Sequence, residues 1–75
     1  MQQFTIRFNN EKDKVNFVRE AERKKYDIDL KHGSKECDGK SLVGVISTFD
    51  LNTDVTMIVN TEEYGIEYDF KYWII

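Results

Sequence analysis

Hydrophobic residues recur at two different spacings along this chain, and each spacing predicts a type of secondary structure. Alternation with polar residues is typical of a half-buried strand, whereas recurrence every three or four residues is typical of an amphipathic helix. Four stretches are expected to be strands: 3–8, 26–31, 36–38 and 55–59. Two stretches are expected to be helices: 11–25 and 42–49. The predicted order is therefore strand, helix, strand, strand, helix, strand and a tail.

The first predicted helix, from about Glu11 to Lys25, has a capping pattern and an apolar stripe. Asn10 followed by Asp13 imitates a capping box, in which two polar side chains satisfy free N–H groups of the first turn. The stripe that faces the core is expected to be Val15, Val18 and Ala21, widened by Phe17. The opposite face is charged and is expected to be solvated.

The second predicted helix follows a turn at Asp38-Gly39. Ser41 stands immediately before the apolar run, where a helix N-cap belongs. The apolar residues that recur at helical spacing are Leu42, Val45, Ile46 and Phe49. A serine hydroxyl at a helix start, followed by exposed apolar residues, suits a docking surface or a phosphorylation site. On capping statistics alone, a purely structural cap is the simpler interpretation of Ser41.

The tail, residues 64–75, fits two structures. As a helix it would place four apolar residues on one face: Ile66, Phe70, Trp73 and Ile74. As a strand it would alternate five apolar or aromatic residues with polar or small ones: Tyr64, Ile66, Tyr68, Phe70 and Tyr72. Gly65 and the aromatic content favour the strand slightly on local grounds.

Together these elements predict one α+β domain that spans residues 1–75. Strands interleaved with helices favour an antiparallel sheet with helices on one face and a polar opposite face. The polar residues expected on the open face include Thr5, Arg7, Asp27, Asp29 and Thr56. A hydrophobic content of 40% suffices for a small core, so wholesale disorder is not expected.

Composition narrows the possible functions. The formal net charge of −3 provides no basic surface for nucleic acid. A single cysteine, Cys37, excludes an internal disulfide and fits a reducing compartment. The N-terminus lacks a signal pattern, and no apolar run approaches the roughly 18 residues of a membrane span. The protein is therefore expected to be cytoplasmic and to bind neither nucleic acid nor a membrane.

A thiol enzyme and a metal site are the other chemistries that the residues suggest. His32 and Cys37 flank one hairpin and could approach as a nucleophilic pair, although no third orienting group is visible. His32 is more simply an exposed turn residue, and Cys37 a small buried hydrophobe. The carboxylates that invite a metal are Asp27, Asp29, Asp50 and Asp54. They lack the close spacing and the glycine of a calcium loop, so no metal or other cofactor is expected.

Three segments carry a family resemblance: Phe17-Val18-Arg19-Glu20-Ala21, Asp27-Ile28-Asp29-Leu30 and Asp38-Gly39-Lys40-Ser41-Leu42-Val43-Gly44-Val45-Ile46-Ser47. Through them most of the chain resembles the HPr family, the small phosphocarrier proteins of the bacterial phosphotransferase system. The last segment is the most specific, because the family's second helix also starts with Lys-Ser and a hydrophobic residue. The resemblance implies an HPr-like open-faced β-sandwich: a four-stranded antiparallel sheet covered on one face by three helices, with the tail as the third helix.

The chain departs from the family at the active site. HPr proteins carry a phosphoryl group on a histidine just before the first helix. The resemblance places Asn10 at the position of this histidine, Lys12 at that of the family's arginine and Asp13 at that of its proline. An asparagine amide cannot act as the accepting nucleophile, so phosphohistidine transfer is expected to be lost. The regulatory serine of the family, by contrast, matches Ser41.

The predicted function is that of a non-enzymatic HPr-like protein that acts by protein–protein contact, with Ser41 as its regulatory phosphorylation site. Partners of the phosphotransferase or carbon-regulation type would bind four residues: Lys40, Leu42, Val43 and Ile46. One alternative is a phosphocarrier-like component of sugar uptake, and another is a small thiol enzyme that uses Cys37. The tail aromatics could also mediate a homodimer.

Overall fold

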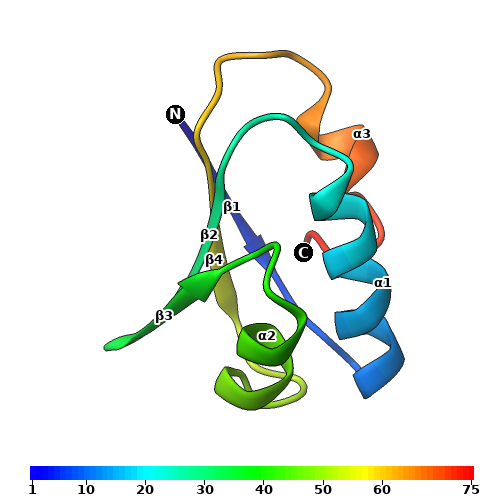
Figure 1. Ribbon diagram of the computed structural model, residues 1–75, viewed down its shortest axis with the longest axis vertical. Coiled ribbons are helices and arrows are strands. Elements are labelled where there is room, and N and C mark those ends of the chain that lie inside the picture. Colours follow the sequence, from blue (N-terminus) through cyan, green and yellow to red (C-terminus); the bar gives the residue numbers. More distant parts are fainter.

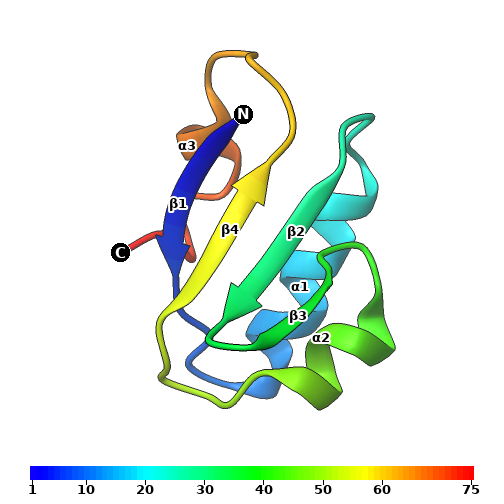
Figure 2. The ribbon, with the colours of Figure 1, turned by 90° about the vertical axis from the view of Figure 1, so that its left-hand side faces the viewer.

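The computed structural model describes all 75 residues, with one four-stranded sheet and three helices on one of its faces (Figures 1 and 2). The strands are β1 (Gln2–Ile6), β2 (Ile28–His32), β3 (Lys35–Asp38) and β4 (Val55–Val59). The helices are α1 (Glu11–Glu22), α2 (Leu42–Thr48) and α3 (Ile66–Asp69). Neighbouring strands are antiparallel and lie in the order β1-β4-β2-β3. The predicted open-faced α+β architecture is confirmed.

The two faces of the sheet differ as the alternation of the strands predicts. One row across the sheet, facing the helices, consists of Phe4, Met57, Leu30 and Cys37. The neighbouring row, facing the opposite side, consists of Thr5, Thr56, Lys31 and Glu36. Figure 2 shows this open face turned toward the viewer, with the helices behind the sheet. The core lies between the first face and the helices.

The core is a single cluster of 15 buried residues that all three helices help to enclose. Its members are Ile6, Phe8, Phe17, Val18, Ala21, Ile28, Leu30, Val45, Phe49, Val55, Met57, Val59, Ile66, Phe70 and Trp73. No helix is long and apolar enough to cross a membrane.

Helix α1 is shorter than predicted, and its buried face contains the predicted stripe except for Val15. It ends at Glu22 rather than at about Lys25, where the N–H groups of Arg23 and Lys24 bond carbonyl oxygens three residues back instead of four. Its buried residues are Asp13, Lys14, Phe17, Val18 and Ala21. Val15, which was predicted to belong to the stripe, is only half-buried.

The strands also begin and end at slightly different residues than predicted. Strand β1 ends at Ile6, although Phe8 beyond it remains buried. His32, expected in the turn after the second strand, is the last residue of β2. The turn itself is Gly33-Ser34, where Gly33 has a φ of 61° that favours glycine.

The tail is a helix at its start, so the strand interpretation of residues 64–75 is wrong for most of that segment. Gly65 precedes α3 with a φ of 87°, a left-handed conformation that favours glycine. Ile66, Phe70 and Trp73 are buried, as the helical face predicts. Only the end is extended, where Ile74 forms a bridge with Ile6 at the outer edge of β1. The burial of three large side chains outweighs the local alternation.

Candidate functional site

The start of α1 is occupied by two side chains that cap the helix. The Asn10 side-chain oxygen accepts a hydrogen bond of 2.8 Å from the Asp13 N–H. The Asp13 carboxylate, which is buried, accepts one of 2.9 Å from the Asn9 N–H. This confirms the predicted cap. Lys12, the position of the family's arginine, is exposed. A buried carboxylate therefore lies where a phosphoryl carrier would need donors for an anion.

The start of α2 is capped by Ser41, as predicted. Its Oγ accepts a hydrogen bond of 3.1 Å from the Gly44 N–H, and its backbone is extended. A side chain at position 44 would place its Cβ only 3.0 Å from this Oγ and would crowd it. Gly44 thus leaves room for the Ser41 hydroxyl, which is half-buried at the helix start.

Exposed apolar side chains follow Ser41 directly. Val43 is 78% exposed, and Leu42 and Ile46 are 42% and 41% exposed. We call these three residues the α2 surface. Helix α2 is held against the core by Val45 and by Phe49, which follows its last turn. Exposed residues of this kind are the ones expected at a contact with another protein. The α2 surface lies at one end of the molecule, at the bottom of Figure 1.

Lys40, also predicted to contact a partner, is engaged within the fold. Its Nζ donates a hydrogen bond of 2.8 Å to the carbonyl oxygen of Lys24, just beyond the end of α1. Its backbone N–H donates to the Asp38 carboxylate at 2.9 Å. The ammonium group therefore links the turn before α2 to α1.

Lys14 was missed at the sequence level. Only 2% of it is exposed, and its Nζ donates to the carbonyl oxygens of Ile46 and Phe49 at the end of α2. A cation is favourable at a helix C-terminus, where carbonyl groups lack helical partners. The signal was present, since residues 14, 17, 18 and 21 have the spacing of one helix face. Lys14 joins the first turn of α1 to the α2 surface.

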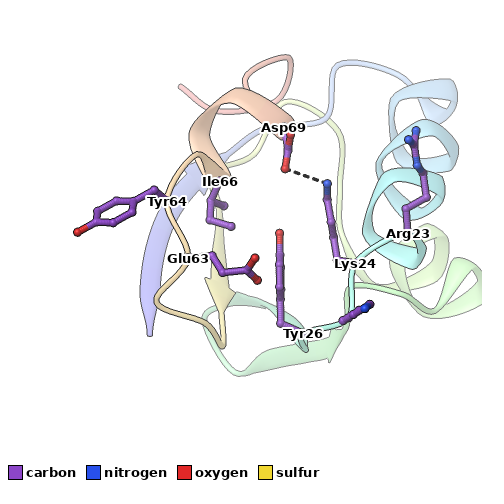
Figure 3. A pocket seen from close by; sticks show the side chains of 8 residues that line it. Arg23, Lys24, Tyr26, Glu63, Tyr64, Ile66 and Asp69 are labelled. Carbon is purple, nitrogen blue, oxygen red and sulfur yellow. Dashed lines mark hydrogen bonds and ion pairs between the residues drawn. The ribbon is translucent and has the colours of Figure 1, made fainter.

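A pocket of about 230 Å³ lies at the other end of α1 (Figure 3). It is lined by Arg23, Lys24, Lys25, Tyr26, Glu63, Tyr64, Ile66 and Asp69. Of the residues predicted to form a site or a contact, only Tyr64, one of the tail aromatics, lines it. The sequence separates its two walls by almost forty residues, and only the packing of α3 beside α1 brings them together.

An ion pair and a buried hydroxyl define the chemistry of this pocket. Lys24 Nζ donates to Asp69 at 2.8 Å and approaches Glu20 at 2.9 Å. The hydrogen bond to Asp69 is the main reason why the pKa of Lys24 is raised. The Tyr26 hydroxyl is buried without a hydrogen-bond partner, and burial raises its pKa. In Figure 3 it points toward the space between Glu63 and the Lys24–Asp69 pair.

The candidate thiol pair is not brought together by the hairpin. The register places Leu30 opposite Cys37 and Lys35 opposite His32. Burial raises the pKa of the Cys37 thiol, whereas an activated thiol has a lowered pKa. His32 is exposed, as expected, with Nδ1 2.7 Å from the Asp54 carbonyl oxygen. No group of three or more metal-ligating side chains occurs in the structure.

Comparison with solved structures identifies the fold. A crystal structure of HPr-C-His from Thermoanaerobacter tengcongensis superposes with a TM-score of 0.74, covering 95% of this chain and 84% of that one. The chain has an HPr-like fold. The two sequences are 21% identical, so this likeness concerns the fold alone. No family model and no curated protein matches the sequence. The implied third helix of the HPr-like sandwich is α3.

Proposed function

We propose that this protein is a non-enzymatic, cytoplasmic HPr-like protein that works by binding other proteins through the α2 surface. The observation that carries the proposal is the exposure of Leu42, Val43 and Ile46 directly after the capped Ser41. The core does not need these side chains, while an interface core would bury them. By resemblance, the partners would be proteins of the phosphotransferase or carbon-regulation type.

In this proposal the chain does not carry a phosphoryl group at the start of α1. Asn10 provides an amide in place of an imidazole, and its oxygen is bound to the Asp13 N–H. The Asp13 carboxylate would repel a phosphoryl group there, since it occupies the end of the helix that attracts anions. The alternative of a phosphocarrier-like sugar-uptake component requires a nucleophile that this position lacks.

Ser41 is the proposed regulatory site. A phosphate there would add nearly two negative charges at the N-terminus of α2, where the helix dipole favours them. The fold should therefore survive the modification, and the charge next to the α2 surface would change instead. A partner with an arginine cluster would gain charge-assisted bonds, and an acidic partner would be repelled.

The first experiment tests phosphoryl carriage. The protein is incubated with phosphoenolpyruvate and the first enzyme of the phosphotransferase system, and acid-labile phosphate is measured. We expect none on the wild-type chain. Asn10→His alone should restore little, because Lys12 and Asp13 also depart from the family pattern. Efficient labelling of the wild type at any residue would overturn this part of the proposal.

The second experiment tests Ser41. The protein is incubated with an HPr kinase and ATP, and wild type is compared with Ser41→Ala and with Ser47→Ala. Ser47 is a matched control, because it is an exposed serine of the same helix. We expect phosphate on the wild type and on Ser47→Ala only. No phosphate on the wild type, or equal phosphate on all three, would leave Ser41 as a structural cap.

A further inference from the structure

The pocket at the end of α1 is the only one in the structure, and it has no part in the proposed function. Its volume of about 230 Å³ is smaller than the roughly 300–1,000 Å³ of pockets that hold drug-sized ligands. Helix α3, which contributes one of its walls, lies at the opposite end of the molecule from α2 (Figure 1). A ligand of this pocket would therefore be a small molecule that binds apart from the α2 surface.

The charged side chains that line the pocket are divided between its two walls by sign. The wall at the end of α1 has three cations, Arg23, Lys24 and Lys25, and the wall from the tail has two carboxylates, Glu63 and Asp69. One ion pair already spans the walls, because Lys24 donates to Asp69 at 2.8 Å. Lys25 and Glu63 form no ion pair. The pocket thus retains an unpaired charge of each sign, one on each wall.

Tyr26 adds a buried hydroxyl that has no hydrogen-bond partner in the protein. In Figure 3 this hydroxyl points toward the space between Glu63 and the Lys24–Asp69 pair. A phenol hydroxyl both donates and accepts, and buried groups of this kind rarely lack a partner. Glu63 is exposed, and its carboxylate is bound only by the Thr61 hydroxyl at 3.3 Å, so this side chain can turn to admit a ligand. Lys24 and Tyr26 also have a raised pKa, and perturbed pKa values are common at functional sites.

We propose that this pocket binds a small zwitterion, a free α-amino acid. The ammonium group of the ligand would bind Glu63, and its carboxylate would accept a hydrogen bond from the Tyr26 hydroxyl and face the cationic wall. Because this hydroxyl points toward the space next to Glu63, the two charged groups of the ligand must be close together, as they are in an α-amino acid.

The distribution of charge favours a zwitterion over an ion of either sign. A cation alone would meet the three cationic side chains of the α1 wall. An anion alone would meet two carboxylates and the carbonyl end of α1, where the helix dipole is negative. Opposite charges on opposite walls are complementary to a molecule that has both.

The apolar part of the lining indicates which amino acid to test. Ile66 and the side chains of Tyr26 and Tyr64 line the pocket, so an aliphatic ligand side chain would find apolar contacts there. Leucine is therefore the probe. It is compared with two analogues of similar shape: isoamylamine, which lacks the carboxylate, and isocaproate, which lacks the ammonium group.

The experiment is an NMR titration of the unmodified protein, with the amide signals of residues 23–26 and 63–69 as the readout. We expect leucine to shift these signals in a saturable way and both analogues to bind at least tenfold more weakly. Tyr26→Phe and Glu63→Gln should each weaken leucine binding about tenfold, since each removes one of the groups that bind the ligand. Tyr26→Phe should fold normally, because the hydroxyl that it removes has no partner.

Two control variants make the same chemical changes outside the pocket. Tyr68→Phe and Glu67→Gln alter exposed residues of the same segment that do not line it, and they should leave leucine affinity unchanged. Absence of shifts with leucine at millimolar concentration would overturn the proposal. So would equal binding of either analogue or of glucose, unchanged affinity in Tyr26→Phe and Glu63→Gln, or an equal loss in the control variants. None of these outcomes depends on Ser41 or on the α2 surface.

Discussion

The two ends of α1 are fastened to neighbouring helices by lysines that work in different ways. Lys14, in the first turn, is buried, and it donates to two main-chain carbonyl oxygens of the α2 end. Lys24, beyond the last turn, is partly exposed, and its partners are the carboxylates of Glu20 and Asp69. Lys14 therefore satisfies backbone carbonyl groups inside the protein, whereas Lys24 forms ion pairs close to the solvent.

The difference predicts different sensitivities. A buried ammonium bound to carbonyl groups is hardly screened by salt, and its removal leaves those carbonyls without a partner. A partly exposed ion pair is screened and contributes little. The α3 end must therefore be held mainly by apolar packing, in which the Trp73 and Phe70 rings lie 5.3 and 5.4 Å from that of Phe17.

The largest expected effect is at the α3 end. Trp73→Ala should lower the free energy of unfolding by about 3–5 kcal/mol, because it removes a buried ring from the cluster around Phe17. This is enough to unfold a domain with the usual margin of stability. Urea unfolding followed by circular dichroism measures the change, with Tyr68→Ala as the exposed control that should cost far less. A loss below about 1 kcal/mol for Trp73→Ala would show that the aromatic cluster does not hold α3.

The next effect is at the α2 end. Lys14→Met should lower the free energy of unfolding by about 2–3 kcal/mol, since it keeps the side-chain volume but removes charged donors from two carbonyl groups. The loss should be the same at low and high salt. Glu11→Gln is the control, because the exposed Glu11 carboxylate lies 3.3 Å from Lys14 but contacts neither carbonyl. A gain in stability with methionine would mean that desolvation of the ammonium outweighs its hydrogen bonds.

Lys14 also marks the limit of what the sequence predicts. The strands, the caps at Asn10 and Ser41 and the core face of α1 follow from spacing, because burial of apolar residues dominates the choice of face. A lysine at a core position is normally assigned to the surface. Its burial becomes favourable only when carbonyl groups from a helix 32 residues away meet it. The spacing of residues 14, 17, 18 and 21 places Lys14 on the core face, but it does not reveal the carbonyl groups that make its burial favourable.

The structure of the tail and the position of the pocket, at the other end of α1, also could not be predicted from local sequence. Alternation in residues 64–72 favoured a strand locally, yet burial of Ile66, Phe70 and Trp73 against α1 and the sheet decided for a helix. The residues of the pocket come from the end of α1 and from this tail. They could be placed together only once the tail's structure was known, whereas the α2 surface is contiguous in sequence.

A smaller effect should follow from removing the exposed partner of Lys24. Asp69→Asn should cost about 0.2–1 kcal/mol at low salt, and the cost should vanish at high salt as screening replaces the lost attraction. Urea unfolding at the two salt concentrations measures it. Asp50→Asn, at an exposed carboxylate that forms no ion pair, is the matched control. A cost that persists at high salt would show that the Lys24–Asp69 pair, like the hydrogen bonds of Lys14, is not screened by salt.

The smallest expected effect is a loss of stability at alkaline pH that originates at the α3 end. The folded-state pKa of Lys24 is raised, mainly by the Asp69 hydrogen bond, so its stabilisation is complete below the unfolded pKa of about 10.4. That stabilisation is lost as pH rises through the higher folded value. Burial raises the pKa of Tyr26 as well, so folding favours the neutral phenol and stability falls above its unfolded pKa of about 10.

Loss of the proton from Lys24 and loss of the proton from Tyr26 both lower stability, and one substitution tests the contribution of each group. Unfolding free energies measured between about pH 8 and pH 11 should decline less in Tyr26→Phe, which removes a hydroxyl without a partner, and less in Asp69→Asn. The half-buried Cys37 thiol, whose pKa is also raised, would add a decline that starts nearer its unfolded pKa of about 8.5 and that Cys37→Ala should remove. Unchanged slopes in Tyr26→Phe and Asp69→Asn would mean that neither Tyr26 nor the Lys24–Asp69 pair contributes to the loss of stability at alkaline pH.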